Sequence, residues 1–270
     1  MKTAKIYRLA GYLFSAGMIT AMLVTTMPTY AASKYQTLVW SDEFTGTSLN
    51  TSKWNYVTGG GGWGNNELQK YTSNSKNVSV SGGFLNIVGR YDAATNTYTS
   101  GRLTTKNKGY WKNYRIDVRA KLPTGVGSWP AIWMLSNGNK YGSQYLANGE
   151  IDFMEEVGAD QNEIVGSAHS LAYNPSNGNT RYATTVIPTA NTAYHTYTLI
   201  NDPEYLSYQI DGVEYYRVVN DHTSYKSWPY DQSFYLLLNL AIGGDWGGYK
   251  GVDTSSMPWS FSIDYVRVYQ

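Results

Sequence analysis

Apolar residues alternate with charged ones along residues 114–121, and this period of two recurs through much of the chain. Tyr114, Ile116, Val118 and Ala120 take every second place, while arginine, aspartate and lysine stand between them. Successive side chains of a strand point to opposite faces, so such a segment forms a strand with one buried face. Amphipathic helix patterns are scarce. The alternation therefore predicts an all-β fold.

Glycine-containing turns separate the predicted strands. Asp211-Gly212 stands between two alternating runs within residues 206–218, which is a strong hairpin signal. The segment at 81–83 (SGG) divides two further apolar runs in the same way. Many short strands joined by tight turns indicate an antiparallel sandwich or barrel, and the length favours a large sandwich with a broad sheet.

The same alternation returns near the end of the sequence. Phe261, Ile263 and Tyr265 occupy every second position, and Asp264 lies between them. We expect these three apolar residues to share the buried face and Asp264 to point the other way.

Aromatic residues are abundant and charged ones scarce. The 270 residues include 26 Tyr, 9 Trp and 6 Phe, and only 15% are charged, against about 25% in typical domains. So many aromatic groups exclude a disordered chain, and a net charge of +1 argues against binding nucleic acid through bulk charge. With no cysteine, disulfides and thiolate chemistry are excluded. The balance suits flat, neutral ligands such as sugars.

The first residues resemble an export signal. Lys2, Lys5 and Arg8 precede an apolar stretch at 9–24, and small residues at 29 and 31 offer a cleavage site. We expect residues 1–31 to be a signal peptide cleaved near 31–33, with an uncleaved anchor as the alternative. Its removal changes the net charge from +1 to −2, because it carries three basic and no acidic residues. The remainder, 34–270, is predicted to be one secreted catalytic domain.

Four carboxylates gather in the segment 149–156 (GEIDFMEE). In a strand, Glu150 and Asp152 project from one face about 6.6 Å apart, whereas Glu155 would point into the core. A one-residue bulge at Phe153-Met154 restores the alternation and brings all three acids to one face. The alternatives are a solvated charged surface and a set of metal ligands. Three acids on one face also suit glycoside hydrolysis, in which one carboxylate attacks the sugar and another protonates the leaving oxygen.

This acidic segment resembles the bulged signature of glycoside hydrolase family 16. The likeness extends to residues 40–44 (WSDEF), 61–69 (GGWGNNELQ), 99–103 (TSGRL), 129–134 (WPAIWM) and 264–269 (DYVRVY). The resemblance implies a β-jelly-roll sandwich with a concave cleft and retaining, endo-acting hydrolysis of a polysaccharide. It implies that Glu150 is the nucleophile, Asp152 the assisting residue and Glu155 the general acid/base. Glu156 matches no catalytic position and is expected to face away from the cleft.

Subgroup features favour laminarin-type β-1,3-glucan as the substrate. The bulged signature is similar to that of laminarinases, agarases and carrageenases, and Ala241, two residues after Asn239, stands where lichenases commonly have an aromatic residue. Cleavage of mixed-linkage β-1,3-1,4-glucan is also expected of many such enzymes. The alternatives are a lichenase, an agar or galactan hydrolase, and a non-catalytic glucan-binding protein.

Several residues match substrate-binding positions of this family. Trp129 and Trp133, four residues apart in a predicted strand, can both line the cleft, and aromatic faces suit the C–H surfaces of sugars. Core packing is the alternative for both. For Arg102 the alternative is an ion pair with Glu67. The full predicted set comprises Asn65, Glu67, Arg102, Trp129, Trp133, His169, Asn239 and Trp246.

No cofactor is expected for catalysis, but the resemblance implies a possible structural calcium, which many family members bind. The matching positions are the backbone of Glu43 and Gly83 and the side chain of Asp264, an all-oxygen set that suits Ca²⁺. The expected partner is β-glucan, with no nucleic acid and no membrane after signal cleavage. We expect a monomer.

Overall fold

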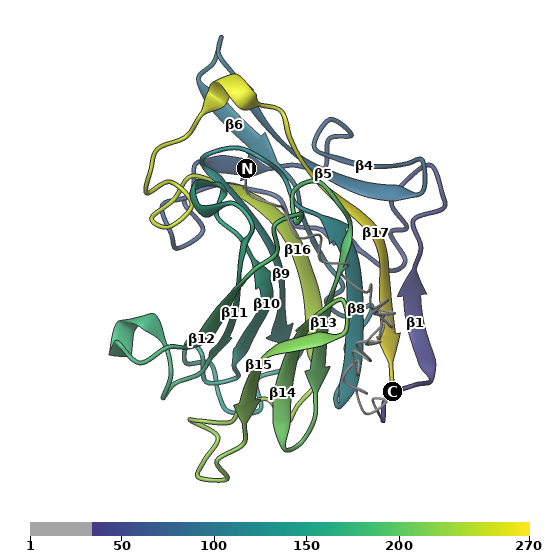
Figure 1. Ribbon diagram of the computed structural model, residues 1–270, viewed down its shortest axis with the longest axis vertical. Coiled ribbons are helices and arrows are strands. Elements are labelled where there is room, and N and C mark those ends of the chain that lie inside the picture. Colours follow the sequence, from purple (N-terminus) through teal and green to yellow (C-terminus); the bar gives the residue numbers. More distant parts are fainter. Residues whose placement is uncertain (1–33) are drawn as a thin grey trace, which may run out of the picture. The chain divides into compact units, whose positions relative to one another are not determined.

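The computed structural model describes residues 34–270, so the predicted signal peptide lies outside the described residues. Two sheets make up this part of the chain (Figure 1). Within it, no helix is long and apolar enough to cross a membrane. Three short 3-10 helices interrupt the loops: η1 (Gly158–Asp160), η2 (Pro175–Asn177) and η3 (Thr254–Ser256). The predicted all-β sandwich is confirmed.

The larger sheet has ten strands. Its main path is β15 (Val213–Val219), β14 (Tyr205–Ile210), β13 (His195–Asn201), β8 (Tyr114–Lys121), β17 (Trp259–Tyr269), β5 (Phe84–Asp92), β6 (Thr97–Ser100) and β3 (Gln69–Tyr71). Two more strands join from the side: β1 (Leu38–Asp42) pairs with β17, and β4 (Val78–Ser81) pairs with β5. All these pairings are antiparallel except that of β3 with β6.

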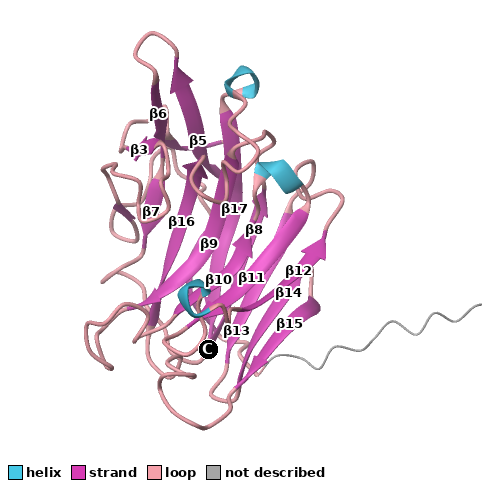
Figure 2. Ribbon diagram, turned by 90° about the vertical axis from the view of Figure 1, so that its left-hand side faces the viewer, coloured by secondary structure: helices cyan, strands magenta, loops and turns pink. Residues whose placement is uncertain are grey.

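The smaller sheet has seven strands, most of which Figure 2 shows side by side from β7 to β12. Their order is β12 (Arg181–Val186), β11 (Glu163–His169), β10 (Glu150–Glu155), β9 (Ser128–Ser136), β16 (Phe234–Ile242), β7 (Arg102–Thr104) and β2 (Asn55–Tyr56). Every residue of β16 is buried, and this strand lies inside the sheet, between β9 and β7.

Alternating strands supply the core between the sheets. In β8 the predicted residues Tyr114, Ile116, Val118 and Ala120 are all fully buried, and the charged residues between them are half-buried. The turn at Asp211-Gly212 joins β14 to β15, with φ of 51° and 80°. Both angles are positive, which matches the type I′ hairpin that such a pair favours.

The expectation for the last strand was partly wrong. Phe261 and Ile263 are buried, but the pairing of β17 with β8 shifts between Ile263 and Tyr265. This irregularity reverses the alternation, so Val266 and Val268 fill the core and Tyr265 stays partly exposed.

Candidate active site

A cleft of about 620 Å³ lies over one face of the smaller sheet. Six of the sheet's strands, which Figure 2 shows from β7 to β12, contribute residues to the lining of this cleft. The three predicted catalytic acids and all eight predicted substrate-binding residues line it: Glu150, Asp152, Glu155, Asn65, Glu67, Arg102, Trp129, Trp133, His169, Asn239 and Trp246. The fold therefore brings together residues that are up to 181 positions apart in sequence.

A bulge in β10 brings the three acids to the same face. Asp152 pairs with Trp133 of β9, and the next pair joins Met154 to Ile132, so Phe153 is the extra residue. Phe153 and Met154 are both buried, whereas Glu150, Asp152 and Glu155 line the cleft. The predicted bulge at Phe153-Met154 is present, because two consecutive apolar residues enter the core and reset the alternation.

The acids lie close enough to influence one another. Glu150, Asp152 and His169 each offer an atom within 4.8 Å of the others, and Nε2 of His169 lies 3.1 Å from Oδ2 of Asp152. Burial raises the pKa of all three acids, and the charge of Asp152 raises the pKa of Glu150 and of Glu155 further. Electrostatic interactions with His169 and Arg102 offset part of this rise in the pKa of Glu150. The site therefore favours holding a proton among its carboxyl groups near neutral pH.

Glu155 is held by the indole of Trp129. Nε1 of Trp129 donates a 3.0 Å hydrogen bond to Oε1 of Glu155. The ring of Trp246 meets that of Trp129 edge-on, with centroids 5.3 Å apart. Trp246 lies in a glycine-rich loop after β16, so this loop reaches the acid through Trp129.

Arg102 is stacked rather than paired with an acid. Its guanidinium lies 4.9 Å from the ring centroid of Trp63 and 4.8 Å from that of Trp133. Nε1 of Trp133 in turn donates a 2.7 Å hydrogen bond to Oδ1 of Asn239. The alternative of an ion pair between Arg102 and Glu67 is not observed between these two described residues. The planar guanidinium fits between two indoles because their π faces attract cations.

Glu67 is bound by neutral donors instead. Its carboxylate accepts hydrogen bonds from Nδ2 of Asn65 at 3.2 Å, from Nε2 of Gln69 at 2.6 Å and from the Tyr71 hydroxyl at 3.4 Å. Oε1 of Gln69 also accepts a 2.7 Å hydrogen bond from the backbone N–H of Ile242, the last residue of β16. This network joins the segment 65–71 to the sheet beside the cleft.

Sequence reasoning missed four aromatic residues of the cleft: Trp63, Tyr71, Tyr145 and Tyr182. Trp63 lies inside the segment that carried the family resemblance, so its neighbours indicated it. Tyr182 stands at an alternating position of β12, where every second residue is exposed. Tyr145 belongs to the loop between β9 and β10, and no local pattern marks it.

The predicted calcium positions lie away from the cleft. Pairing of Ile263 with Leu85 and of Asp42 with Val266 places Glu43, Gly83 and Asp264 around the middle of β17. The carboxylate of Glu43 accepts two hydrogen bonds from Arg267, at 3.0 and 2.9 Å, and Asp264 pairs with Arg119. The carboxylate of Asp264 thus already has Arg119 as its partner, and calcium binding at these three positions stays a prediction.

Comparisons with known proteins agree with this arrangement. Residues 63–267 match the sequence profile described as glycosyl hydrolases family 16. A β-glucanase of Rhodothermus marinus is 42% identical over 279 aligned residues, covering 100% of this chain and 97% of the relative. The X-ray structure of a laminarinase from Rhodothermus marinus has a TM-score of 0.83 and 44% identity, covering 87% of this chain and 97% of that one. A non-specific endo-β-1,3(4)-glucanase named SCLam has a TM-score of 0.83 and 39% identity, covering 90% and 94%.

Proposed function

The chain belongs to glycosyl hydrolase family 16, and from this premise we propose that it is a secreted endo-β-1,3-glucanase that retains anomeric configuration. The observation that carries the proposal is the bulged strand β10, which presents Glu150, Asp152 and Glu155 together in a cleft. Two tryptophans of the adjacent strand β9 flank these acids. Acids beside aromatic surfaces are what hydrolysis of a neutral polysaccharide requires.

In the first step the Glu150 carboxylate attacks the anomeric carbon. Glu155 donates its proton to the glycosidic oxygen, the bond to the leaving sugar breaks, and a glycosyl ester forms on Glu150. The raised pKa of Glu155 keeps this group protonated, as a general acid must be. In the second step Glu155 takes a proton from water, the resulting hydroxide attacks the same carbon, and Glu150 leaves.

Asp152 assists by sharing a proton with its neighbours. It lies between the nucleophile and the acid along β10, and its side chain is buried. A protonated Asp152 can donate a hydrogen bond to the Glu150 carboxylate, which favours the charged nucleophile. Nε2 of His169, on the neighbouring strand β11, lies 3.1 Å from Oδ2 of Asp152.

Laminarin-type β-1,3-glucan is the substrate we favour, with mixed-linkage β-1,3-1,4-glucan as a second. The relatives include a laminarinase and an endo-β-1,3(4)-glucanase, which supports both. Ala241 lines the cleft and leaves open the space that an aromatic side chain would fill. We further propose a monomer, exported after signal cleavage, with calcium held by Glu43, Gly83 and Asp264. Chelation of a bound calcium would lower the melting temperature while the active site stays intact.

The test is to offer the purified protein laminarin, lichenan, barley glucan and agarose and to analyse the linkages of the products. We expect hydrolysis of β-1,3 linkages in laminarin, which gives oligosaccharides with new reducing ends. Proton NMR should detect the β-anomer of these reducing ends first. Glu150→Gln should abolish hydrolysis yet still bind laminarin. An α-anomer as first product would contradict the retaining mechanism, and cleavage of agarose alone would contradict the substrate.

A further inference from the structure

The register of the smaller sheet lines up residues from four strands in one row. Asp152 pairs with Trp133 of β9 on one side and with Ser167 of β11 on the other, and Ser167 pairs with Tyr182 of β12. Directly paired residues project from the same face of a sheet. All four line the cleft. A polysaccharide that lies across the strands therefore passes Trp133, the acids and Tyr182 in turn.

The two sides of this row differ in chemistry. On the side of β9, β16 and β7 the cleft has four indoles and a stacked arginine, namely Trp63, Trp129, Trp133, Trp246 and Arg102. On the side of β11 and β12 the strands offer Tyr182 as their one tyrosine and no tryptophan among the described lining residues, beside Glu163, Val165, Ser167, His169 and Thr184. Tyr182 is 60% exposed, although large aromatic side chains are usually well buried. The ring of Tyr182 therefore lines the cleft and does not pack in the core.

The distance from the acids suits a sugar ring. Neighbouring strands lie about 4.8 Å apart, so Tyr182 stands about 10 Å from Asp152, a length that roughly two pyranose rings span. Ser167 between them is small and buried, so nothing bulky stands in the row between the acids and Tyr182. We propose that Tyr182 is the aromatic platform of a sugar-binding subsite across the acids from Trp133, about two rings from the bond that is cut. This inference rests on the proposed glucanase function.

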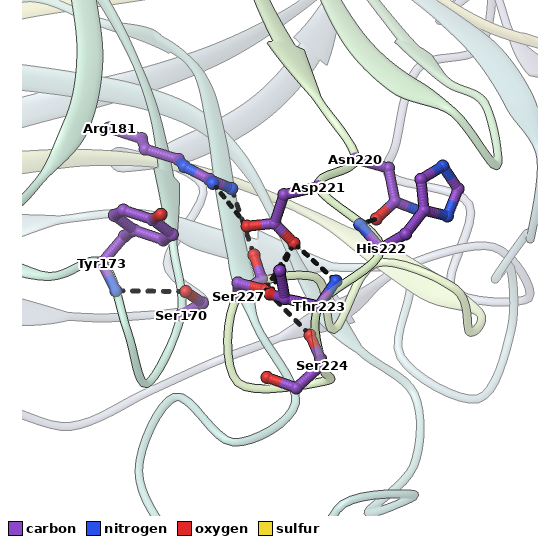
Figure 3. A network of polar contacts seen from close by, with 9 residues as sticks. All are labelled: Ser170, Tyr173, Arg181, Asn220, Asp221, His222, Thr223, Ser224 and Ser227. Carbon is purple, nitrogen blue, oxygen red and sulfur yellow. Dashed lines mark hydrogen bonds and ion pairs between the residues drawn. The ribbon is translucent and has the colours of Figure 1, made fainter.

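Tyr182 belongs to β12, the strand at one edge of the smaller sheet. Contacts of its neighbour Arg181 hold the start of this strand. The neighbouring Arg181 lies with its guanidinium 3.5 Å from the ring centroid of Tyr173, donates to the backbone oxygen of Ser227 at 3.1 Å and pairs with Asp221 at 3.3 Å (Figure 3). The carboxylate of Asp221 also accepts a 2.7 Å hydrogen bond from the Ser227 hydroxyl.

These contacts tie the start of β12 to the loop that precedes it and to the loop between β15 and β16. An edge strand fixed in this way keeps the ring of Tyr182 in place before a sugar arrives, which reduces the entropy lost on binding.

The test compares Tyr182→Ala, Tyr182→Phe and the parent on β-1,3-linked oligosaccharides of increasing length, labelled at the reducing end. Tyr110→Ala is the matched control, because Tyr110 is also exposed but lies outside the cleft lining. For Tyr182→Ala we expect kcat/KM to fall about tenfold on oligosaccharides long enough to reach the subsite, and the positions of cleavage to shift. Short aryl glycosides should be cleaved at the parent rate. Tyr182→Phe and Tyr110→Ala should resemble the parent at every length.

The parent is assayed on laminarin first, so the two proposals fail differently. An inactive parent would overturn the proposed function. An active parent whose cleavage pattern and length dependence are unchanged in Tyr182→Ala would overturn the subsite. An equal loss on short and long substrates would also overturn it, since that result indicates damage to the catalytic centre.

Discussion

Nε1 of Trp129 donates a hydrogen bond to Oε1 of Glu155 across 3.0 Å. The bond joins an aromatic residue of β9 to an acid of β10, one strand away. Trp129 therefore has two expected roles, because its ring lines the cleft while its N–H stabilises the charged form of Glu155.

Removing this donor should change the pH profile. In Trp129→Phe the ring remains but the N–H is lost, so the pKa of Glu155, already raised by burial, should rise further. A general acid must be protonated, so the alkaline limb of kcat/KM should move to higher pH, while the rate at the optimum falls about tenfold. The pH dependence of laminarin hydrolysis measures both effects. An alkaline limb that stays in place or moves to lower pH would contradict the role of this hydrogen bond.

The roles of Glu150 and Glu155 can be separated by chemical rescue. Glu155→Ala should lose roughly 10²–10⁴-fold in laminarin hydrolysis, yet an aryl glycoside with a good leaving group should still form the glycosyl ester. Azide should then restore turnover and give a β-glycosyl azide. Glu150→Ala is the matched variant, and azide should there give the α-product, because it replaces the nucleophile itself. The reverse pattern of anomers would show that the two roles are exchanged.

Because of the bulge in β10, deleting one of its two apolar residues and deleting both should have opposite effects on hydrolysis. Deleting Met154 leaves the acids at alternate positions, so all three still face the cleft, and hydrolysis should remain measurable. The lost core side chain should lower the free energy of unfolding by about 2–5 kcal/mol. Deleting both Phe153 and Met154 turns Glu155 toward the core and brings Glu156 to the cleft face, so the double deletion is combined with Glu156→Gln, which removes this third acid and should abolish activity. A folded single-deletion protein as inactive as the double deletion would contradict this account, with circular dichroism reporting the fold.

Glu156 should make stability depend on pH. It is fully buried, accepts hydrogen bonds from the backbone N–H of Asn162 and from Nδ2 of Asn191, and has a pKa raised by burial to about 7. A raised folded-state pKa means that its contribution is fully present below about pH 4 and is lost as pH rises through 7, by up to roughly 3 kcal/mol. Glu156→Gln should therefore lose less stability between pH 5 and pH 8 than the parent. Urea unfolding across this range measures the difference, and parallel curves for the two proteins would refute it.

Local pattern predicted much of the fold and the arrangement of the acids. The alternation in 114–121 gave the buried face of β8, and the cost of burying a charged glutamate indicated the bulge beside Phe153. Both inferences need only neighbouring residues. The shift at Tyr265 could not be read in this way, because pairing with β8 determines it.

Partners across the sheet were equally hard to predict. Glu67 binds Gln69 and Tyr71, which are near it in sequence, rather than Arg102. Arg102 stacks on Trp63 and Trp133, which come from segments far from it in sequence. The position of Tyr182 in the row of Asp152 likewise depends on the pairing of β10, β11 and β12. Such contacts follow from register, which a single sequence does not specify.

Strand β17 lies between β8 and β5 in the middle of the larger sheet, although it spans residues 259–269. Until the ribosome has passed these residues, the hairpin of β4 and β5 has no connection through this sheet to β8, β13, β14 and β15. Without β17, strands β8 and β5 of this sheet each have an edge with no partner, and unpaired edges favour aggregation. The protein should therefore need a chaperone or rapid release during synthesis more than a protein whose central strands are made first.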